Sequence, residues 1–202
     1  MLTPEKPDLG DKHDASGKAV FLDRDGTVNR NTHFLIDFAE FELIPGVEDA
    51  LRILQGLGYR LFGVSNQSGV AKGYFTYAAV EDLNRSIVAD LGARGIRLEE
   101  IAFCPHHPEG VVTEYAKACG CRKPAPGMLK DLARKHGLDL SQSFMVGDSD
   151  SDAQAGLNAG AQGVWIRPET TQLVDFGRVD NPRKIKEFPS LLDFARNLRE
   201  FA

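Results

Sequence analysis

Short apolar runs alternate along this chain with longer segments of helical periodicity, and this alternation limits the fold more than any other feature. An apolar run at residues 19–23 precedes a segment at residues 47–57 whose apolar side chains recur at helical spacing, and the same succession repeats towards the C-terminus. Strands that alternate with helices are typical of a parallel sheet covered by helices. We therefore predict an α/β fold, a three-layer Rossmann-like domain with a parallel sheet and no second globular domain.

The remaining elements follow from the same patterns. Further strands are expected at residues 59–65, 101–105, 143–148 and 163–166. Helices are expected at about residues 76–91, 127–136 and 152–159, and a short segment at 184–188 and an amphipathic one at 190–201 complete the chain.

Polar residues stand where several of these strands end. The strand-end or neighbouring positions are Asp23, Ser65, Cys104 and Asp148. Ligands of open α/β sheets bind outside the carboxyl ends of the strands. We therefore expect these side chains to converge on one crevice, which is the candidate functional site.

Length and composition limit the classes of protein that remain. A chain of 202 residues with 42% hydrophobic and 26% charged residues is ordinary for one globular domain, here 18–202, preceded by a flexible tail at 1–17. The formal net charge of −5 argues against a nucleic-acid partner. No apolar run or leader pattern indicates a membrane partner or export, so we expect a cytoplasmic monomer that acts on a small molecule.

The sequence FLDRDGT places Asp23 and Asp25 directly after the first strand. Two carboxylates this close repel each other, and a divalent cation removes that cost; carboxylate-rich sites suit Mg²⁺. Asp23 is a candidate nucleophile, because carboxylates form aspartyl-phosphates, and Asp25 is a candidate general acid and base. Gly26 permits the sharp turn. The alternative is a solvated, aspartate-rich turn.

A second acidic segment, GDSDSD at residues 147–152, also follows an apolar strand. Asp148 could supply a metal ligand from a neighbouring strand end, with Asp152 as a supporting carboxylate one turn later. The alternatives are helix capping by serine or aspartate and a calcium loop. The segment lacks the glycine and the later glutamate that an EF-hand loop needs.

Two further segments, VSNQSG at 64–69 and CRKP at 121–124, could hold phosphate. Ser65 and Asn66 can donate hydrogen bonds to phosphoryl oxygens, and Lys123 can neutralise their charge. Arg122 adds a planar donor fork suited to a second phosphate or to sugar hydroxyls. The nucleotide-type loops GxxxxGK[ST] and GxGxxG are absent from the sequence. The alternative for each segment alone is solvated surface.

All three cysteines lie within residues 104–121, in the pattern CPHH followed by CGC. Cys104, Cys119 and Cys121 with either His106 or His107 make a closed Cys₃His set, which is typical of structural zinc. Zinc would fix a loop at residues 104–121 and would thereby position Arg122 and Lys123, which directly follow it. The alternative is idle thiols beside a surface turn. The other histidines, His13, His33 and His136, are expected at the surface.

Taken together, FLDRDGT, VSNQSG, CRKP and VGDSDSD resemble the four motifs of the haloacid dehalogenase-like (HAD-like) phosphatases. CPHHPEG, CGCRKPAPGML and VSNQSGVAKG resemble more specifically the heptose 1,7-bisphosphate 7-phosphatases and their relatives, the histidinol-phosphate phosphatases. The resemblance extends over about residues 18–167. It implies a site with little or no cap, in which loops select the substrate.

The resemblance also implies a role for each matching position. Asp23 resembles the nucleophile and Asp25 the acid and base, and Mg²⁺ would be bound by the Asp23 carboxylate, the Asp25 carbonyl and Asp148. Ser65 and Lys123 would hold the transferring phosphoryl group. The implied zinc ligands are Cys104, His106, Cys119 and Cys121, and the implied substrate contacts are Asn31, Thr32, His33, Phe34, Gln67, Ser68 and Arg122. Ser149 departs from the pattern, because close relatives often carry lysine there.

The expected activity is therefore Mg²⁺-dependent removal of the C7 phosphate of a D-glycero-D-manno-heptose 1,7-bisphosphate, for synthesis of a bacterial surface polysaccharide. Arg122 favours a substrate with a second anionic group, and histidinol phosphate is the alternative substrate. Two alternatives belong to other classes. One is a phospho-acceptor signalling domain, which would not need Asp25, and the other is a zinc-stabilised interaction module without catalysis.

Overall fold

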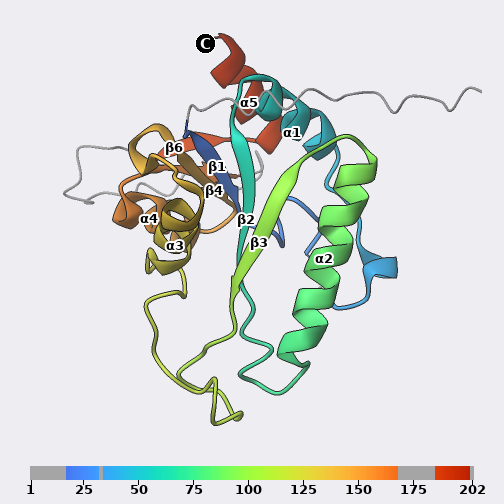
Figure 1. The fold of residues 1–202 in the computed structure, drawn as a ribbon, viewed down its shortest axis with the longest axis vertical. Helices are drawn as coiled ribbons and strands as arrows, with labels where there is room; N and C mark the ends of the chain where they lie inside the picture. The colour runs from blue at the N-terminus through green and yellow to red at the C-terminus, as the bar shows by residue number, and fades with distance from the viewer. Residues whose placement is uncertain (1–16, 32–33, 168–184, 201–202) are drawn as a thin grey trace, which may run out of the picture.

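A computed structural model of the chain describes residues 17–31, 34–167 and 185–200, and in these residues six parallel strands form one sheet (Figure 1). The strand order is β3-β2-β1-β4-β5-β6. The bounds are β1 Ala19–Leu22, β2 Arg60–Asn66, β3 Leu98–Cys104, β4 Phe144–Gly147, β5 Gln162–Ile166 and β6 Lys186–Phe188.

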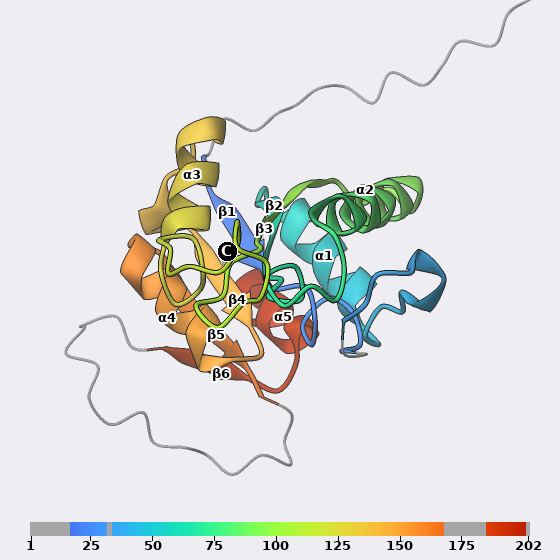
Figure 2. The same cartoon turned by 90° about the horizontal axis from the view of Figure 1, so that it is seen from below.

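Helices cover both faces of this sheet and make three layers (Figure 2). The α-helices are α1 Val47–Gly56, α2 Tyr77–Ala93, α3 Gly127–His136, α4 Asp150–Ala159 and α5 Leu191–Glu200, with 3₁₀ turns at Phe38–Glu40 and Leu140–Gln142. Helices α1, α2 and α5 pack on one face, and α3 and α4 on the other. The predicted three-layer α/β fold is confirmed.

Strand β1 shows how the sequence builds both layers at once. Successive side chains of a strand point to opposite faces. Val20 and Leu22 lie in the core formed with α1, α2 and α5, whereas Ala19 and Phe21 lie in the core formed with α3 and α4. A strand that is buried on both faces must be apolar throughout, which explains the uninterrupted run AVFL.

Strand order reverses between β1 and β4. The chain leaves β1 for β2 and β3 on one side, and β4, β5 and β6 lie on the other side of β1. In doubly wound sheets such a reversal opens a crevice at the carboxyl ends of the two strands. Asp23 and Asp148 are the first residues beyond β1 and β4, so the topology itself brings them to that crevice.

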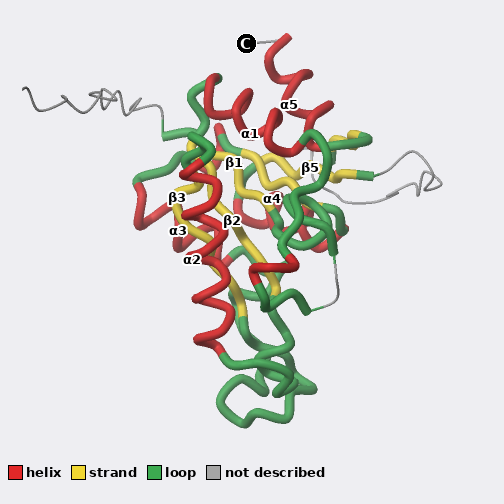
Figure 3. Tube along the Cα trace, turned by 90° about the vertical axis from the view of Figure 1, so that its right-hand side faces the viewer, coloured by secondary structure: helices red, strands yellow, loops and turns green. Residues whose placement is uncertain are grey.

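A loop at residues 105–126 extends from the carboxyl end of β3 and contains neither helix nor strand (Figures 1 and 3). Long irregular loops in compact domains commonly serve a function. No helix in the described part of the chain is long and apolar enough to cross a bilayer.

Three sequence expectations require correction. Strand β3 begins at Leu98, three residues earlier than predicted, because an edge strand tolerates Glu99 and Glu100 beside solvent. Helix α4 begins at Asp150 rather than at Asp152. The ring of His136 is not a surface group: it packs 4.8 Å from the ring centroid of Phe62 with 18% of its side chain exposed. His13 and His33 lie outside the described residues.

Candidate active site

Asp23 is fixed at the mouth of the sheet by the pairing of β1 with β4. Its backbone N–H donates to the carbonyl oxygen of Val146 over 2.8 Å, which continues the ladder one residue past the strand. The side chain is 8% exposed, and its Oδ1 accepts a hydrogen bond of 2.6 Å from Lys123 Nζ. The predicted nucleophile therefore lies at the base of the crevice, paired with a cation.

Lys123 bridges two carboxylates. Its Nζ lies 2.6 Å from Asp152 Oδ1 as well as from Asp23 Oδ1, and it donates to the Val64 carbonyl oxygen over 2.6 Å. Burial alone would lower the pKa of Lys123, but the charges of Asp23 and Asp152 outweigh burial and raise it. The lysine therefore remains an ammonium ion although it is only 4% exposed.

The Lys123 backbone is held by Asn66 at the end of β2. Asn66 Nδ2 donates to the Lys123 carbonyl over 3.1 Å, and the Lys123 N–H donates to Asn66 Oδ1 over 3.0 Å. The sequence predicted Asn66 as a phosphate donor. In the structure its side-chain amide is committed to the loop that carries Lys123, so it positions the cation.

The Asp25 carboxylate accepts hydrogen bonds from three side chains. Arg24 donates to both oxygens, from Nε to Oδ1 over 3.1 Å and from NH2 to Oδ2 over 2.8 Å. Asn29 Nδ2 donates to Oδ1 over 3.1 Å, and Gln67 Nε2 donates to Oδ2 over 2.8 Å. Arg24 was not predicted as a functional residue. The one sequence feature that could have indicated it is its position between Asp23 and Asp25.

Asp148 lies directly beside Gly26. Gly26 has φ +95°, and a Cβ added there would stand 2.0 Å from Asp148 Oδ2. One oxygen each of Asp23, Asp148 and Asp152 lies within 4.8 Å of the others. The turn after β1 therefore needs glycine both for its backbone angle and for the approach of Asp148.

Negative charge is in excess at this cluster. Burial raises the pKa of Asp23 to about 7 against the opposing charge of Lys123. Loss of surrounding water, together with the charge of Asp152, raises the pKa of Asp148 to about 6. A divalent cation would relieve this repulsion, and oxygen donors alone suit Mg²⁺. The residues present therefore fit the predicted magnesium ion.

Asp152 has its own partners. Its Oδ2 accepts from the Ser149 N–H over 3.1 Å and from the Ser149 hydroxyl over 2.5 Å, which caps α4, and its Oδ1 pairs with Lys123. The two interpretations of the GDSDSD segment are therefore compatible: Asp152 caps the helix and supports Lys123, whereas Asp148 joins Asp23 and Asp152 in the carboxylate cluster.

A pocket of about 300 Å³ opens above these groups. Its lining contains most of the predicted phosphate and substrate residues, namely Asn31, Phe34, Ser65, Asn66, Gln67, Ser68 and Lys123, together with Asp23, Asp25, Ser149, Ser151 and Asp152. Arg122 is not part of this lining; its NH1 lies 3.4 Å from the His106 carbonyl oxygen, to which it donates. Thr32 and His33 lie outside the described residues.

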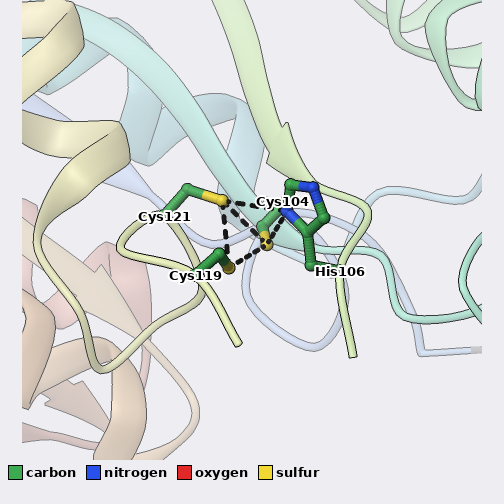
Figure 4. A group of neighbouring side chains, drawn as sticks. All are labelled: Cys104, His106, Cys119 and Cys121. Carbon is green, nitrogen blue, oxygen red and sulfur yellow. Dashed lines mark hydrogen bonds between the residues drawn. The ribbon is translucent and has the colours of Figure 1, made fainter. Parts of the chain in front are cut away.

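The cysteine segment folds into a single cluster (Figure 4). The three sulfur atoms of Cys104, Cys119 and Cys121 lie 3.1–3.5 Å apart, and the thiols are free. His106 Nδ1 lies 3.3 Å from Cys121 Sγ and 3.6 Å from Cys104 Sγ. Sulfurs bound to one tetrahedral zinc at ~2.3 Å would stand about 3.8 Å apart. The cluster therefore fits a metal with little rearrangement.

The geometry also distinguishes the two neighbouring histidines. His106 turns its ring towards the sulfurs, whereas His107 Nδ1 accepts a hydrogen bond from the Glu109 N–H over 3.2 Å. Burial raises the pKa of the Cys104 thiol. The cysteine and histidine side chains that could hold a metal together are therefore Cys104, His106, Cys119 and Cys121.

Comparison with known proteins relates this arrangement to one group of enzymes. A family profile described as "HAD-hyrolase-like" matches residues 120–192. A D-glycero-beta-D-manno-heptose-1,7-bisphosphate 7-phosphatase of Rhodopseudomonas palustris is 43% identical over 75% of this chain and 84% of its own length. The protein of the same name from Escherichia coli (strain K12) is 41% identical over 84% of this chain and 94% of its own length.

Solved structures agree with the sequence relatives. The D,D-heptose 1,7-bisphosphate phosphatase of B. bronchiseptica, in complex with magnesium and phosphate, superposes with a TM-score of 0.74 at 29% identity, over 92% of this chain and 99% of its own. A HAD-like phosphatase from Mesorhizobium loti superposes with a TM-score of 0.75 at 33% identity, over 90% of this chain and 87% of its own.

Proposed function

This chain belongs to the haloacid dehalogenase-like phosphatases, in the group of heptose-1,7-bisphosphate 7-phosphatases, and from that membership we propose that it removes the C7 phosphate of D-glycero-beta-D-manno-heptose 1,7-bisphosphate. The observation that supports this most directly is the bridge from Asp23 through Lys123 to Asp152, with Asp25 in the same pocket. A nucleophile, a phosphate-binding cation and an acid–base group are thus within reach of one phosphoryl group.

The proposed first step transfers the phosphoryl group to the protein. An Asp23 carboxylate oxygen forms the bond to phosphorus as the bond from phosphorus to the C7 oxygen breaks. Asp25 gives its proton to the departing sugar oxygen, which leaves as the alcohol. Lys123 and the Ser65 hydroxyl, both in the pocket lining, stabilise the negative charge of the transferring oxygens.

The second step returns the protein to its starting state. Asp25, now a carboxylate, takes a proton from water as the water oxygen forms a bond to phosphorus. The bond between phosphorus and Asp23 breaks, and inorganic phosphate leaves. Proton transfer of this kind typically contributes about 10²–10⁴-fold to a rate. A phospho-acceptor domain would not need this group, so Asp25 separates the two classes.

We assign the two metal sites to different tasks. Asp23, Asp148 and the Asp25 carbonyl would hold Mg²⁺, which when bound neutralises charge on the phosphoryl oxygens. Cys104, His106, Cys119 and Cys121 would hold Zn²⁺ in a closed structural site. The zinc would fix the loop at 105–126, in which Arg122 and Lys123 directly follow Cys121.

The proposed preference for a bisphosphate depends on groups beyond the 300 Å³ pocket. Arg122 follows Cys121 and directly precedes Lys123, which lines the pocket, and a second phosphate would gain from its bidentate donor. The beta anomer is proposed because the relatives compared above carry that name. We also propose that the protein is a cytoplasmic monomer. Its product would be a precursor of surface polysaccharide.

A substrate panel tests the proposal. Purified protein with Mg²⁺ is given the beta and alpha heptose 1,7-bisphosphates and histidinol phosphate, and kcat/KM is measured for each by phosphate release. We expect the beta bisphosphate to be the best substrate by at least about tenfold, which corresponds to 1.4 kcal/mol. A preference for histidinol phosphate would contradict the substrate assignment. Absence of turnover on every sugar phosphate would favour a non-catalytic zinc module.

A further inference from the structure

We propose that Arg24 is a positioning residue that holds the Asp25 carboxylate where it can exchange protons with the sugar oxygen and with water. The inference rests on the proposed function, in which Asp25 is the acid and base. It concerns a residue that lies between the two reacting carboxylates but does not line the pocket itself.

The contact between the two side chains is a two-point fork. Arg24 Nε and NH2 donate to different oxygens of Asp25, over 3.1 and 2.8 Å. A planar guanidinium that engages both oxygens fixes the plane of the carboxylate as well as its distance. Asn29 and Gln67 add one donor to each oxygen, so the carboxylate accepts from four directions. Rotation of Asp25 would break several of these bonds together.

Burial makes this arrangement costly unless it serves a purpose. The Arg24 side chain is 2% exposed and is the largest fully buried side chain among the described residues. A buried guanidinium must be paired and hydrogen-bonded. Besides Asp25, its partner is Asn84, whose Oδ1 accepts from Arg24 NH1 over 3.1 Å. Helix α2, which contains Asn84, thus holds Arg24 in place.

Arg24 also balances charge. Four carboxylates, those of Asp23, Asp25, Asp148 and Asp152, gather at the ends of β1 and β4, and Lys123 pairs with two of them. Arg24 pairs with the ionised form of Asp25, which is the form that takes a proton from water in the second step. The two cations therefore divide the site: Lys123 serves the phosphoryl position, and Arg24 serves the proton-transfer position.

Leaving groups of different basicity test this role. A sugar alkoxide needs a proton as it departs, whereas an activated aryl oxide leaves without one. We expect Arg24→Met to slow first-turnover release of the sugar by about 10²-fold, the typical cost of a misplaced catalytic group. First-turnover release of the phenol from an activated aryl phosphate should change by less than about threefold. Equal losses with both substrates would indicate a merely structural role and overturn the proposal, as would no loss with either.

Two further variants keep the test decisive if Arg24→Met does not fold. Arg24→Lys keeps the charge but not the fork, and we expect an intermediate loss confined to the sugar phosphate. Asn84→Ala removes the acceptor of the Arg24 NH1 hydrogen bond. Asn84 borders a groove of about 810 Å³, which can accommodate the smaller side chain. This variant should show the same pattern at roughly tenfold. Glu81→Ala, on the same groove but without a contact to Arg24, is the matched control and should leave both rates unchanged.

The comparison of the two leaving groups also separates the proposed role of Arg24 from the proposed substrate. It uses any alkyl phosphate that the wild-type protein hydrolyses, so it remains valid if heptose bisphosphate is a poor substrate. In that case the substrate assignment fails while the leaving-group pattern still decides the role of Arg24.

Discussion

Lys123 controls the charge balance of the site at the scale of single side chains. Its ammonium group lies between two buried carboxylates that have no other cation within ion-pairing distance among the described residues. A buried pair whose cation is removed leaves uncompensated charge in a poorly solvated place. The residue is thus structural and functional at once.

Replacement of this cation should be visible in stability. We expect Lys123→Met to lower the free energy of unfolding by about 3–5 kcal/mol, because Asp23 and Asp152 then repel without compensation. Adding Asp152→Asn should recover part of the loss, because it removes one of the two charges. Urea unfolding of metal-free protein measures both. An unchanged midpoint for Lys123→Met would contradict the charge balance described here.

Gly26 provides a test of the approach of Asp148. We expect Gly26→Ala to weaken Mg²⁺ binding and to cost more than about 1 kcal/mol, because φ +95° strains alanine and its Cβ would stand 2.0 Å from Asp148 Oδ2. Gly56→Ala in α1 is the matched control, since nothing lies within 4 Å of its added Cβ. Calorimetric Mg²⁺ titration compares the two. Equal Mg²⁺ affinity in both variants would show that Gly26 is not required.

At this scale the sequence predicted the reacting groups better than their partners. Asp23, Asp25 and Asp148 were predicted because each follows an apolar strand, and the chemistry of neighbouring carboxylates is local. The contact of Arg24 with Asn84 joins residues 60 positions apart, so no local pattern announces it. The contact of the Asn66 side-chain amide with the Lys123 backbone, 57 positions away, is likewise absent from any local pattern.

At the scale of elements, the loop at residues 105–126 depends on its cluster rather than on secondary structure. Cys104 ends β3, and Cys121 precedes Arg122 and Lys123. A metal that joins the two ends of the loop would restrict Lys123 without touching substrate. The spacing of the cysteines predicted this cluster, whereas only the fold distinguished His106 from His107 on geometric grounds.

Loss of one sulfur ligand should separate metal binding from chemistry. We expect Cys119→Ser to reduce bound zinc from about one equivalent to below about half, to lower Tm and to reduce kcat/KM. His107→Ala, which lies outside the cluster, should leave zinc content and Tm unchanged. Elemental analysis and thermal unfolding of protein purified without added metal provide the measurements. Full zinc content in Cys119→Ser would contradict the four-ligand assignment.

The ends of helices and strands were predicted correctly where neighbouring residues determine them. They were missed where the position of a strand in the sheet determines them. Helix α3 matches its predicted span of residues 127–136, because its apolar periodicity ends at a glycine in the left-handed region. The start of β3 was missed because two glutamates resemble a loop until the strand is known to lie at the sheet edge.

At the scale of the whole molecule, helix α5 returns the C-terminal part of the chain to the core. Phe194 is 1% exposed, and its ring centroid lies 5.3 Å from that of Phe144 in β4 and 5.4 Å from that of Phe188 in β6. The helix thereby packs with α1 and the sheet around one hydrophobic core. Strand order came from the structure alone, since sequence patterns show which segments are strands and not which strands are neighbours.

This packing predicts a loss of stability without a loss of chemistry. We expect Phe194→Ala to lower the free energy of unfolding by about 3–5 kcal/mol, because a buried aromatic ring is replaced by a cavity. The kcat of the remaining folded protein should change little, because Phe194 does not line the pocket. Val111→Ala, at a side chain that is 77% exposed, should change stability by less than about 0.5 kcal/mol. A fall in kcat for Phe194→Ala with unchanged stability would contradict this account.

The division of work between the two aspartates is the central claim, and trapping the phosphoenzyme tests it most directly. In an Asp25→Asn variant supplied with an activated aryl phosphate and Mg²⁺, the phosphoryl group should reach Asp23 and remain there, because the general base for its hydrolysis is missing. Borohydride reduction of that acyl phosphate converts the aspartate to homoserine. Trypsin then releases residues 19–24, in which Asp23 is the sole side-chain carboxylate. The account predicts homoserine at position 23 of this peptide, and an unreduced peptide with full burst release of the phenol would contradict it.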